Sequence, residues 1–204
     1  MSYKTIKNEA SAELTVKKSK FIATIKPIIS VVEAEEYIDK IKKENKSARH
    51  NVYAYRIFES NVDKYSDDGE PAGTSGSAIL SVMKKKELFN TVAVVTRYFG
   101  GILLGTGGLV SAYTQSFSAV LEKTKIINSI KHKVVDFEID YETYQIISTI
   151  CKNLTAKILF SEFTDKVKLK IAVPEKQFQL FESQVSEIGV KFLSEIKNVY
   201  IKEK

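Results

Sequence analysis

The chain has 204 residues, of which 44% are hydrophobic and 27% are charged, and its formal net charge at pH 7 is +6. This composition excludes a disordered chain, which is poorer in apolar residues, and a collagen-like chain, which is far richer in Gly and Pro. The single cysteine, Cys151, excludes an intramolecular disulfide, and no apolar run approaches the roughly 20 residues that a membrane-spanning helix needs.

The first part of the chain alternates between the hydrophobic periods of strands and helices. Phe21, Ala23 and Ile25 alternate as in a strand, and Ser30 is placed to cap the helix that follows. The β-branched run at residues 91–96 is typical of a strand that is buried on both faces. The predicted elements are, in chain order, one bent or two short strands at 13–28, a helix at 31–45, a strand at 50–57 followed by a loop, a helix at 75–86, a strand at 91–96 and a helix at 108–123. On the helix at 75–86, Ile79, Leu80 and Met83 are expected to face inward.

The last part of the chain has a pattern of its own. Its predicted elements are a strand at 133–140, a helix with Cys151 on its apolar face, strands at 156–160 and 167–173, a helix at 178–188 that ends at Gly189, and a strand at 190–200. This β-α-β-β-α-β order is the signature of a ferredoxin-like domain. We therefore predict an α+β protein of two domains, residues 1–130 and 131–204.

The positive charge is concentrated in the first predicted domain. Up to Ile130 there are 19 basic and 14 acidic residues, a net charge of +5, whereas the remainder has 12 and 11, a net charge of +1. One basic cluster consists of Lys17, Lys18 and Lys20. Because a basic surface attracts polyanions, this distribution favours a nucleic-acid partner, although a lysine-rich solvated surface would look the same.

Eight of the nine glycines lie between Gly69 and Gly108, so the unusual backbone is concentrated there. The first glycine-rich segment is DDGEPAGTSG, residues 67–76. Its carboxylates are the hard oxygen ligands that Mg²⁺ prefers, and they belong to Asp67, Asp68 and Glu70. The backbone N–H groups of Gly73, Thr74 and Ser75 lead into the predicted helix and would attract an anion. Acidic residues that only stabilise a turn and a helix start would give the same pattern.

The second segment, residues 97–113, follows the buried strand and opens a helix, which is the geometry that binds phosphate. It matches neither the P-loop nor the dinucleotide fingerprint. We expect Arg97 either to bind phosphate there, helped by Arg56, or to pair with the carboxylates of the first segment. The candidate glycines are Gly100, Gly101, Gly105, Gly107 and Gly108. We also expect the two glycine-rich segments to meet in the fold around Arg97, unless they form only a tight structural loop.

His50 is the third candidate for chemistry. It begins a predicted strand, where its imidazole would act as a general acid or base. A lone histidine is more often structural, so we favour a structural role for His50 over a catalytic one. No Ser-His-Asp order stands out, and the sequence contains neither an HExxH nor a CxxC motif.

The two glycine-rich segments, DDGEPAGTSG (67–76) and RYFGGILLGTGGLVSAY (97–113), together resemble the Impact/YigZ family. The segments KKSKFIA (17–23) and ARHNVYAYR (48–56) add to the resemblance, which extends over nearly the whole chain. The resemblance implies an N-terminal Impact domain with a two-layer α/β fold, similar to a ribosomal-protein domain, and a C-terminal ferredoxin-like domain. It further implies a cytosolic protein whose eukaryotic relatives regulate translation.

We therefore favour a cytoplasmic binding protein that is associated with translation and that contacts RNA, a ribosome or a ribosome-associated protein. No cofactor and no membrane partner are expected, and the sequence does not predict the oligomeric state. A first alternative is a Mg²⁺-dependent enzyme for a phosphorylated or nucleotide substrate, in which Asp68 and Glu70 ligate the metal and His50 transfers protons. A second alternative is a protein–protein interaction module with purely architectural glycine-rich segments.

Overall fold

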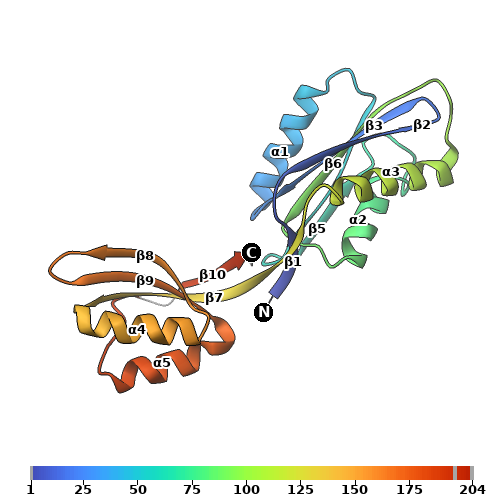
Figure 1. Ribbon diagram of the computed structural model, residues 1–204. Coiled ribbons are helices and arrows are strands. Elements are labelled where there is room, and N and C mark those ends of the chain that lie inside the picture. Colours follow the sequence, from blue (N-terminus) through green and yellow to red (C-terminus); the bar gives the residue numbers. More distant parts are fainter. Residues whose placement is uncertain (1, 195–196, 203–204) are drawn as a thin grey trace. The chain divides into compact units, whose positions relative to one another are not determined.

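A computed structural model describes residues 2–194 and 197–202 of the chain (Figure 1). The chain forms two compact units, of which one contains Tyr3–Asn128 and the other begins at Ser129. This division lies two residues from the one expected at residues 130 and 131. The described residues form five α-helices and ten strands, and this mixed architecture confirms the predicted fold class. Within this described part, no helix is long and apolar enough to cross a membrane.

The first unit is built on an antiparallel sheet of five strands. These strands are β2 (Ala10–Val16), β3 (Ser19–Pro27), β4 (His50–Ile57), β5 (Val62–Ser66) and β6 (Thr91–Tyr98). Their order across the sheet is β2-β3-β6-β4-β5, and all neighbours are antiparallel. The central strand is β6, which explains why its β-branched run is buried on both faces.

Helices cover both faces of this sheet (Figure 1). The helices are α1 (Val31–Glu44), α2 (Gly76–Lys85) and α3 (Gly105–Leu121). On β6, Val92 and Val94 pack into the core beneath α1, whereas Ala93 and Val95 pack into the core beneath α2 and α3. The two-layer expectation therefore needs a correction, because α1 adds a third layer to the domain.

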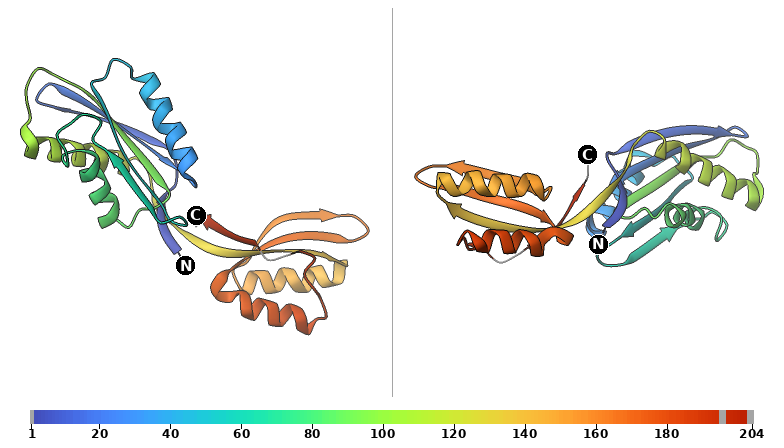
Figure 2. Two further views of the ribbon diagram at one scale, coloured as in Figure 1. Left: turned by 180° about the vertical axis from the view of Figure 1, so that it is seen from behind. Right: turned by 60° about the horizontal axis from the view of Figure 1, so that its bottom comes forward.

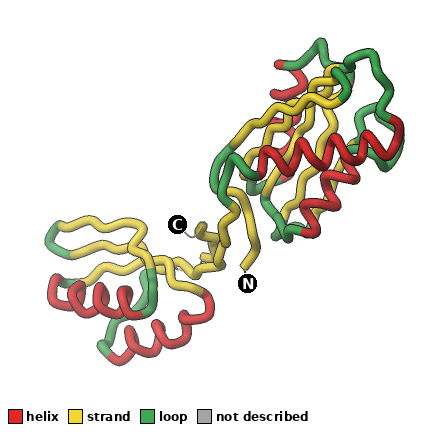
Figure 3. Tube along the Cα trace, turned by 45° about the vertical axis from the view of Figure 1, so that its right-hand side comes forward, coloured by secondary structure: helices red, strands yellow, loops and turns green. Residues whose placement is uncertain are grey.

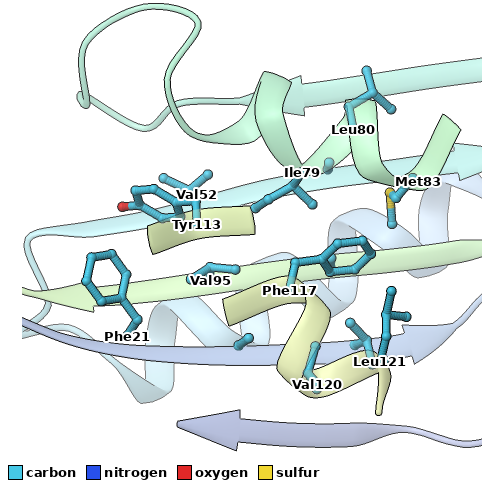
Figure 4. Packing of buried hydrophobic residues seen from close by; sticks show 14 of the residues in the cluster. Phe21, Val52, Ile79, Leu80, Met83, Val95, Tyr113, Phe117, Val120 and Leu121 are labelled. Atoms are coloured by element: carbon cyan, nitrogen blue, oxygen red, sulfur yellow. The ribbon is translucent and has the colours of Figure 1, made fainter. Parts of the chain in front are cut away.

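The core beneath α2 and α3 is the larger one and positions the candidate site (Figure 4). Ile79, Leu80 and Met83 of α2 are buried there, as their helical spacing predicted. From α3, Tyr113 and Phe117 enter the same core, and the Tyr113 ring meets the edge of Phe21 at 5.2 Å between centroids. Burying these large rings stabilises the attachment of α3 to the sheet.

The second unit has the predicted ferredoxin-like order. Its elements are β7 (Ile126–Ile139), α4 (Tyr141–Asn153), β8 (Lys157–Phe163), β9 (Val167–Pro174), the short 3₁₀ helix η1 (Glu175–Gln177), α5 (Phe178–Glu187) and β10 (Lys197–Lys202). Strand β7 pairs with both β9 and β10, and β8 pairs with β9. Both helices pack on one face of this sheet (Figure 2, left).

Several element boundaries differ from the predictions for physical reasons. Strand β1 (Ser2–Ile6), which pairs with β7, was not predicted, and β5 lies where a loop was predicted. Strand β5 lies at a sheet edge and its residues are exposed or half-buried, so it lacks an apolar alternation. The last strand was predicted from residue 190 but begins at Lys197, and Leu193 instead donates its N–H to the Asp136 carbonyl.

Candidate functional site

The two glycine-rich segments meet at a pocket of about 330 Å³ in the first unit. Gly69, Glu70 and Pro71 come from the first segment, and residues between Arg97 and Leu109 come from the second. The expectation that the two segments meet around Arg97 is confirmed, since Arg97 Nη1 donates to Glu70 Oε1 at 2.6 Å.

The sheet register explains why these residues come together. Strands β4 and β6 are antiparallel neighbours, and His50 pairs directly with Arg97. The Arg49 N–H donates to the Arg97 carbonyl oxygen at 3.1 Å and extends this contact beyond β4. The start of β4 and the end of β6 therefore form one edge of the site, although they are far apart in the sequence.

Glu70 is the centre of a buried polar network. The carboxylate Oε1 accepts from Arg97 Nη1 and, at 2.8 Å, from the Tyr113 hydroxyl. The side chains of Arg97 and Glu70 are 6% and 4% exposed, so this ion pair is almost completely desolvated. Burial, together with the neighbouring Glu70 carboxylate, raises the pKa of Tyr113 well above its ordinary value. Tyr113 therefore remains protonated and continues to donate to Glu70.

His50 lies beside this network and is held in a defined orientation. Its Nδ1 lies 2.7 Å from the Asp68 carbonyl oxygen. Because a carbonyl oxygen only accepts, Nδ1 carries the proton and Nε2 has the lone pair in the neutral imidazole. Nε2 is 3.9 Å from Glu70 Oε1, and His50 lines the pocket. The free lone pair on Nε2 could accept a proton. The hydrogen bond from Nδ1 to the Asp68 carbonyl also stabilises the turn at Asp68, which is a structural role.

Asp67 occupies the anion site that was expected at the start of α2. Its Oδ2 accepts from the N–H of Gly73 at 2.9 Å, and its Oδ1 accepts from the N–H groups of Ser75 and Gly76 at 3.0 and 2.8 Å. Thr74 is buried as well, and its hydroxyl donates to the Pro71 carbonyl. The expected anion site at Gly73, Thr74 and Ser75 is thus corrected, because a carboxylate of the chain itself already fills it.

Asp68 has hydrogen-bond partners that the other two carboxylates do not share. Its Oδ2 accepts from the Asn51 N–H at 2.6 Å, and its Oδ1 accepts from Lys42 Nζ at 3.3 Å. Asp67, Asp68 and Glu70 therefore have three different sets of partners. Among residues 2–194 and 197–202, no group of three or more His, Cys, Asp or Glu side chains is arranged to hold a metal ion. The expected Mg²⁺ ligands Asp68 and Glu70 do not form a cluster.

The start of α2 is bound by the Asp67 carboxylate, whereas the start of α3 is open, without a side-chain cap. The first turn of α3 contains no acidic residue, and Leu104 at the N-cap position provides no side-chain hydrogen bond. Gly105 and Thr106 line the pocket, and Gly105 has a φ of +70°, a conformation that favours glycine. The start of α3, whose first N–H groups have no partner within the helix, therefore lines the same pocket as Arg49 and Arg97.

The loop from β6 to α3 (Figure 3) is held against a hairpin turn. The Gly100 N–H donates to Ser19 Oγ at 3.1 Å, and a Cβ on Gly100 would lie 2.0 Å from the Lys18 carbonyl carbon. This contact requires glycine and places part of the predicted Lys17–Lys20 cluster beside the loop. Gly101, an exposed residue, lies in the same loop, and Gly107 and Gly108 lie in the first turn of α3.

Arg56 does not belong to this site. In the sheet register it pairs with Thr91, at the end of β4 and β6 opposite to the His50–Arg97 pair. Its Nε donates to Asp63 Oδ1 at 2.7 Å, its Nη1 donates to the Leu88 carbonyl, and its guanidinium lies 3.9 Å from the centre of the Phe89 ring. The expected role of Arg56 in phosphate binding is corrected, since these contacts make it a structural residue.

Several residues of the site were not predicted. They include Arg49, Phe99, Leu103, Thr106 and Tyr113. Arg49 and Phe99 each directly neighbour a residue that was singled out, His50 and Gly100, so proximity along the chain was an available signal. Tyr113 lies two turns into α3, and nothing in its spacing singled it out. The role of its hydroxyl follows only from the position of Glu70.

Comparisons with known proteins agree with the two-unit architecture. The profile of the Impact N-terminal domain matches residues 17–121, and that of a domain of unknown function (DUF1949) matches residues 137–189. The chain is 36% identical over 188 residues to the IMPACT family member YvyE of Bacillus subtilis, a match that covers 92% of this chain and 87% of that protein. It is 31% identical over 179 residues to the IMPACT family member YigZ of Escherichia coli, covering 85% and 87%.

A solved structure adds to these matches. The crystal structure of a protein described as hypothetical aligns with 100% of this chain and 98% of its own, with a TM-score of 0.63 and 27% sequence identity. The matched Impact N-terminal region contains both glycine-rich segments and therefore the whole pocket described above.

Proposed function

The chain belongs to the Impact family, and we propose that it is an RNA-binding protein associated with translation that holds an RNA phosphate at the start of α3. The observation that carries the proposal is the open helix start, which faces a pocket lined by two arginines. Backbone N–H groups at a helix start attract anions, and guanidinium groups match the geometry of phosphate.

The charges around the pocket support an anionic ligand. Glu70 neutralises part of the charge of Arg97, but the exposed Arg49 has no acidic partner among the described ion pairs. The turn that holds Lys17 and Lys18 packs against the loop at Gly100. The net charge of +5 up to Ile130 adds long-range attraction for a polyanion.

The association with translation comes from the family. Its eukaryotic members, as the resemblance implies, regulate translation, and RNA is the abundant phosphate-rich component of the translation machinery. A magnesium-dependent enzyme has less support, because the carboxylates that would ligate the metal point in different directions. We therefore favour a binding function over catalysis.

The test is RNA binding by two matched variants, Thr106→Glu and Thr106→Gln. Thr106 is exposed and lies in the first turn of α3, so a glutamate there would place an internal anion where the phosphate is proposed to bind. We expect Thr106→Glu to weaken the binding of a structured RNA at least tenfold at low salt and Thr106→Gln to change it little. Equal affinities of the two variants would refute phosphate binding at this helix start.

The salt dependence of the affinity for RNA gives a second test of phosphate binding. Each phosphate contact that is lost should lower the slope of log K against log salt by about 0.7–0.9. Arg49→Gln is expected to lower the slope by this amount, whereas Lys43→Gln, at an exposed position on α1, is the matched control. Two results together would indicate a protein partner instead of RNA. The wild-type protein would bind a ribosomal protein even after nuclease treatment, and it would not bind free RNA.

A further inference from the structure

The pocket has an apolar wall that the proposed phosphate site does not use. Leu104, Leu109 and Pro71 line it together with Phe99 and Leu103. Phe99 is 38% exposed and Leu103 is 84% exposed, so Leu103 contributes little to the core. Isolated exposed apolar residues are ordinary, but here they line a concave site together with charged residues.

The polar side of the same pocket contains an unsatisfied donor. Arg97 is 5% exposed, and its Nε is buried without a hydrogen-bond partner among the described residues. Buried polar atoms nearly always have partners, so the guanidinium keeps an unused donor beneath the pocket. Arg97 lines the pocket together with Gly105 and Thr106 at the open start of α3. The positive charge of the guanidinium and the start of α3 therefore lie at the same pocket, and both favour an anion there.

The arginines also connect the two sides of the pocket. The guanidinium groups of Arg49 and Arg97 each lie 5.5 Å from the centre of the Phe99 ring. Unpaired nucleic-acid bases stack on aromatic rings and on the plane of an arginine guanidinium. Phe99, Leu103 and Arg49 thus provide a surface for a flat apolar group next to the anion site.

The size of the pocket limits what it can accept. Its volume of about 330 Å³ lies at the lower end of the range of roughly 300–1,000 Å³ for small-ligand pockets. A base within a duplex is stacked on both sides and paired along one edge, so it cannot enter a pocket of this size. A single nucleotide with an exposed base and a phosphate has both of the chemical features that the walls require.

We propose that the pocket takes one unpaired nucleotide of an RNA, with its phosphate at the start of α3 and Arg49 and its base against Phe99 and Leu103. This inference rests on the proposed RNA-binding function and narrows it to single-stranded or extruded nucleotides. The buried Arg97–Glu70 pair forms the floor of the site and positions the guanidinium, while the exposed groups of the rim make the contacts.

The experiment compares the affinities of a labelled short single-stranded RNA and of the same strand annealed to its complement, measured by fluorescence anisotropy. We expect the single strand to bind at least tenfold more tightly, and a nucleoside monophosphate to displace it at lower concentration than inorganic phosphate does. Phe99→Ala and Leu103→Ser should each weaken single-strand binding, by about tenfold for Phe99. Ile29→Ser, at a position 73% exposed and outside the pocket, is the matched control and should bind as the wild type does.

The outcomes separate this inference from the proposed function. Equal affinities for single strand and duplex, or wild-type binding by Leu103→Ser, would overturn the unpaired-nucleotide site, and sensitivity to Thr106→Glu would then keep the phosphate site intact. Displacement by inorganic phosphate as readily as by the nucleotide would also overturn it. A wild-type protein that binds neither RNA would end both proposals. Because Leu103 is highly exposed, its variant should fold even if Phe99→Ala does not.

Discussion

The starts of α2 and α3 present the same backbone chemistry and use it in opposite ways. At α2, three N–H groups are bound by the carboxylate of Asp67, which is supplied by the chain itself. At α3, the first turn has neither an acidic residue nor a side-chain cap, and it faces a pocket with two arginines. One helix start is therefore part of the architecture, and the other is available to a ligand.

The contrast between the two helix starts shows how a glycine-rich turn before a helix should be interpreted. Such a turn only creates donors, and whether they bind a ligand depends on whether a carboxylate elsewhere in the chain reaches them first. Asp67 lies eight residues before Ser75 and reaches it because the turn at Asp68 and Gly69 folds the chain back. No side chain on the described part of the second segment plays this role for α3.

The largest effect is expected from the ion pair beneath the open site. Arg97→Met would leave Glu70 buried without its cation and should lower the free energy of unfolding by about 3–5 kcal/mol. Urea denaturation measures the loss. The double variant Arg97→Met/Glu70→Gln should recover a large part of it, because no charge then remains buried. If the free energy of unfolding of Arg97→Met were within about 1 kcal/mol of the wild-type value, Arg97 would not be the group that stabilises the buried Glu70 carboxylate.

Opening the start of α2 should have the next largest effect. Asp67→Ala removes the acceptor of three backbone donors, and we expect a loss of about 2–3 kcal/mol in urea denaturation. Asp67→Asn retains one acceptor oxygen and should lose less. Added sulfate should stabilise Asp67→Ala more than it stabilises the wild type, since the vacated site would accept an anion. An Asp67→Ala protein as stable as the wild type would remove the contrast between the two helices.

A pH effect comes from Tyr113 on α3. Because its pKa is raised in the folded protein, the unfolded chain ionises this phenol first as the pH rises above about 10, so the folded state loses stability there by up to about 1.4 kcal/mol per pH unit. Tyr113→Phe should show a shallower fall in denaturation experiments above pH 10. The pKa values of Tyr37 and Tyr55 are both raised to about 12 by burial. These two residues therefore account for the loss of stability that remains in Tyr113→Phe above pH 10. Parallel curves for variant and wild type would contradict the burial of this hydroxyl.

Closing the start of α3 should have the smallest effect on stability. Thr106→Glu places a negative charge at the positive end of the helix dipole and should stabilise the protein by about 0.3–1 kcal/mol, whereas Thr106→Gln should not. Thermal denaturation at low salt measures the difference. A destabilised Thr106→Glu protein would mean that α3 does not begin as described. Gained stability together with lost RNA affinity would separate folding from function at one residue.

Local patterns were sufficient for most of the first unit and for the order of the second. Ser30 caps α1 as predicted, with the Glu33 N–H donating to its hydroxyl at 3.2 Å. The buried run of β6 and the apolar positions of α2 were also predicted correctly, because periodicity reports burial directly. Strand β5 could not be predicted, since an exposed edge strand needs only a neighbour with free hydrogen-bonding groups.

The location of the site could be predicted from the residues alone, because the concentration of glycines between Gly69 and Gly108 and the two long motifs are visible there. The partners of the carboxylates became known only from the folded chain: Asp67 binds the start of α2, Asp68 binds Asn51 and Glu70 binds Arg97. Hydrogen bonds and ion pairs depend on distances of a few ångströms between residues that are far apart in the sequence. Adjacent positions in a turn can therefore point to three different neighbours, and no spacing in the sequence records which.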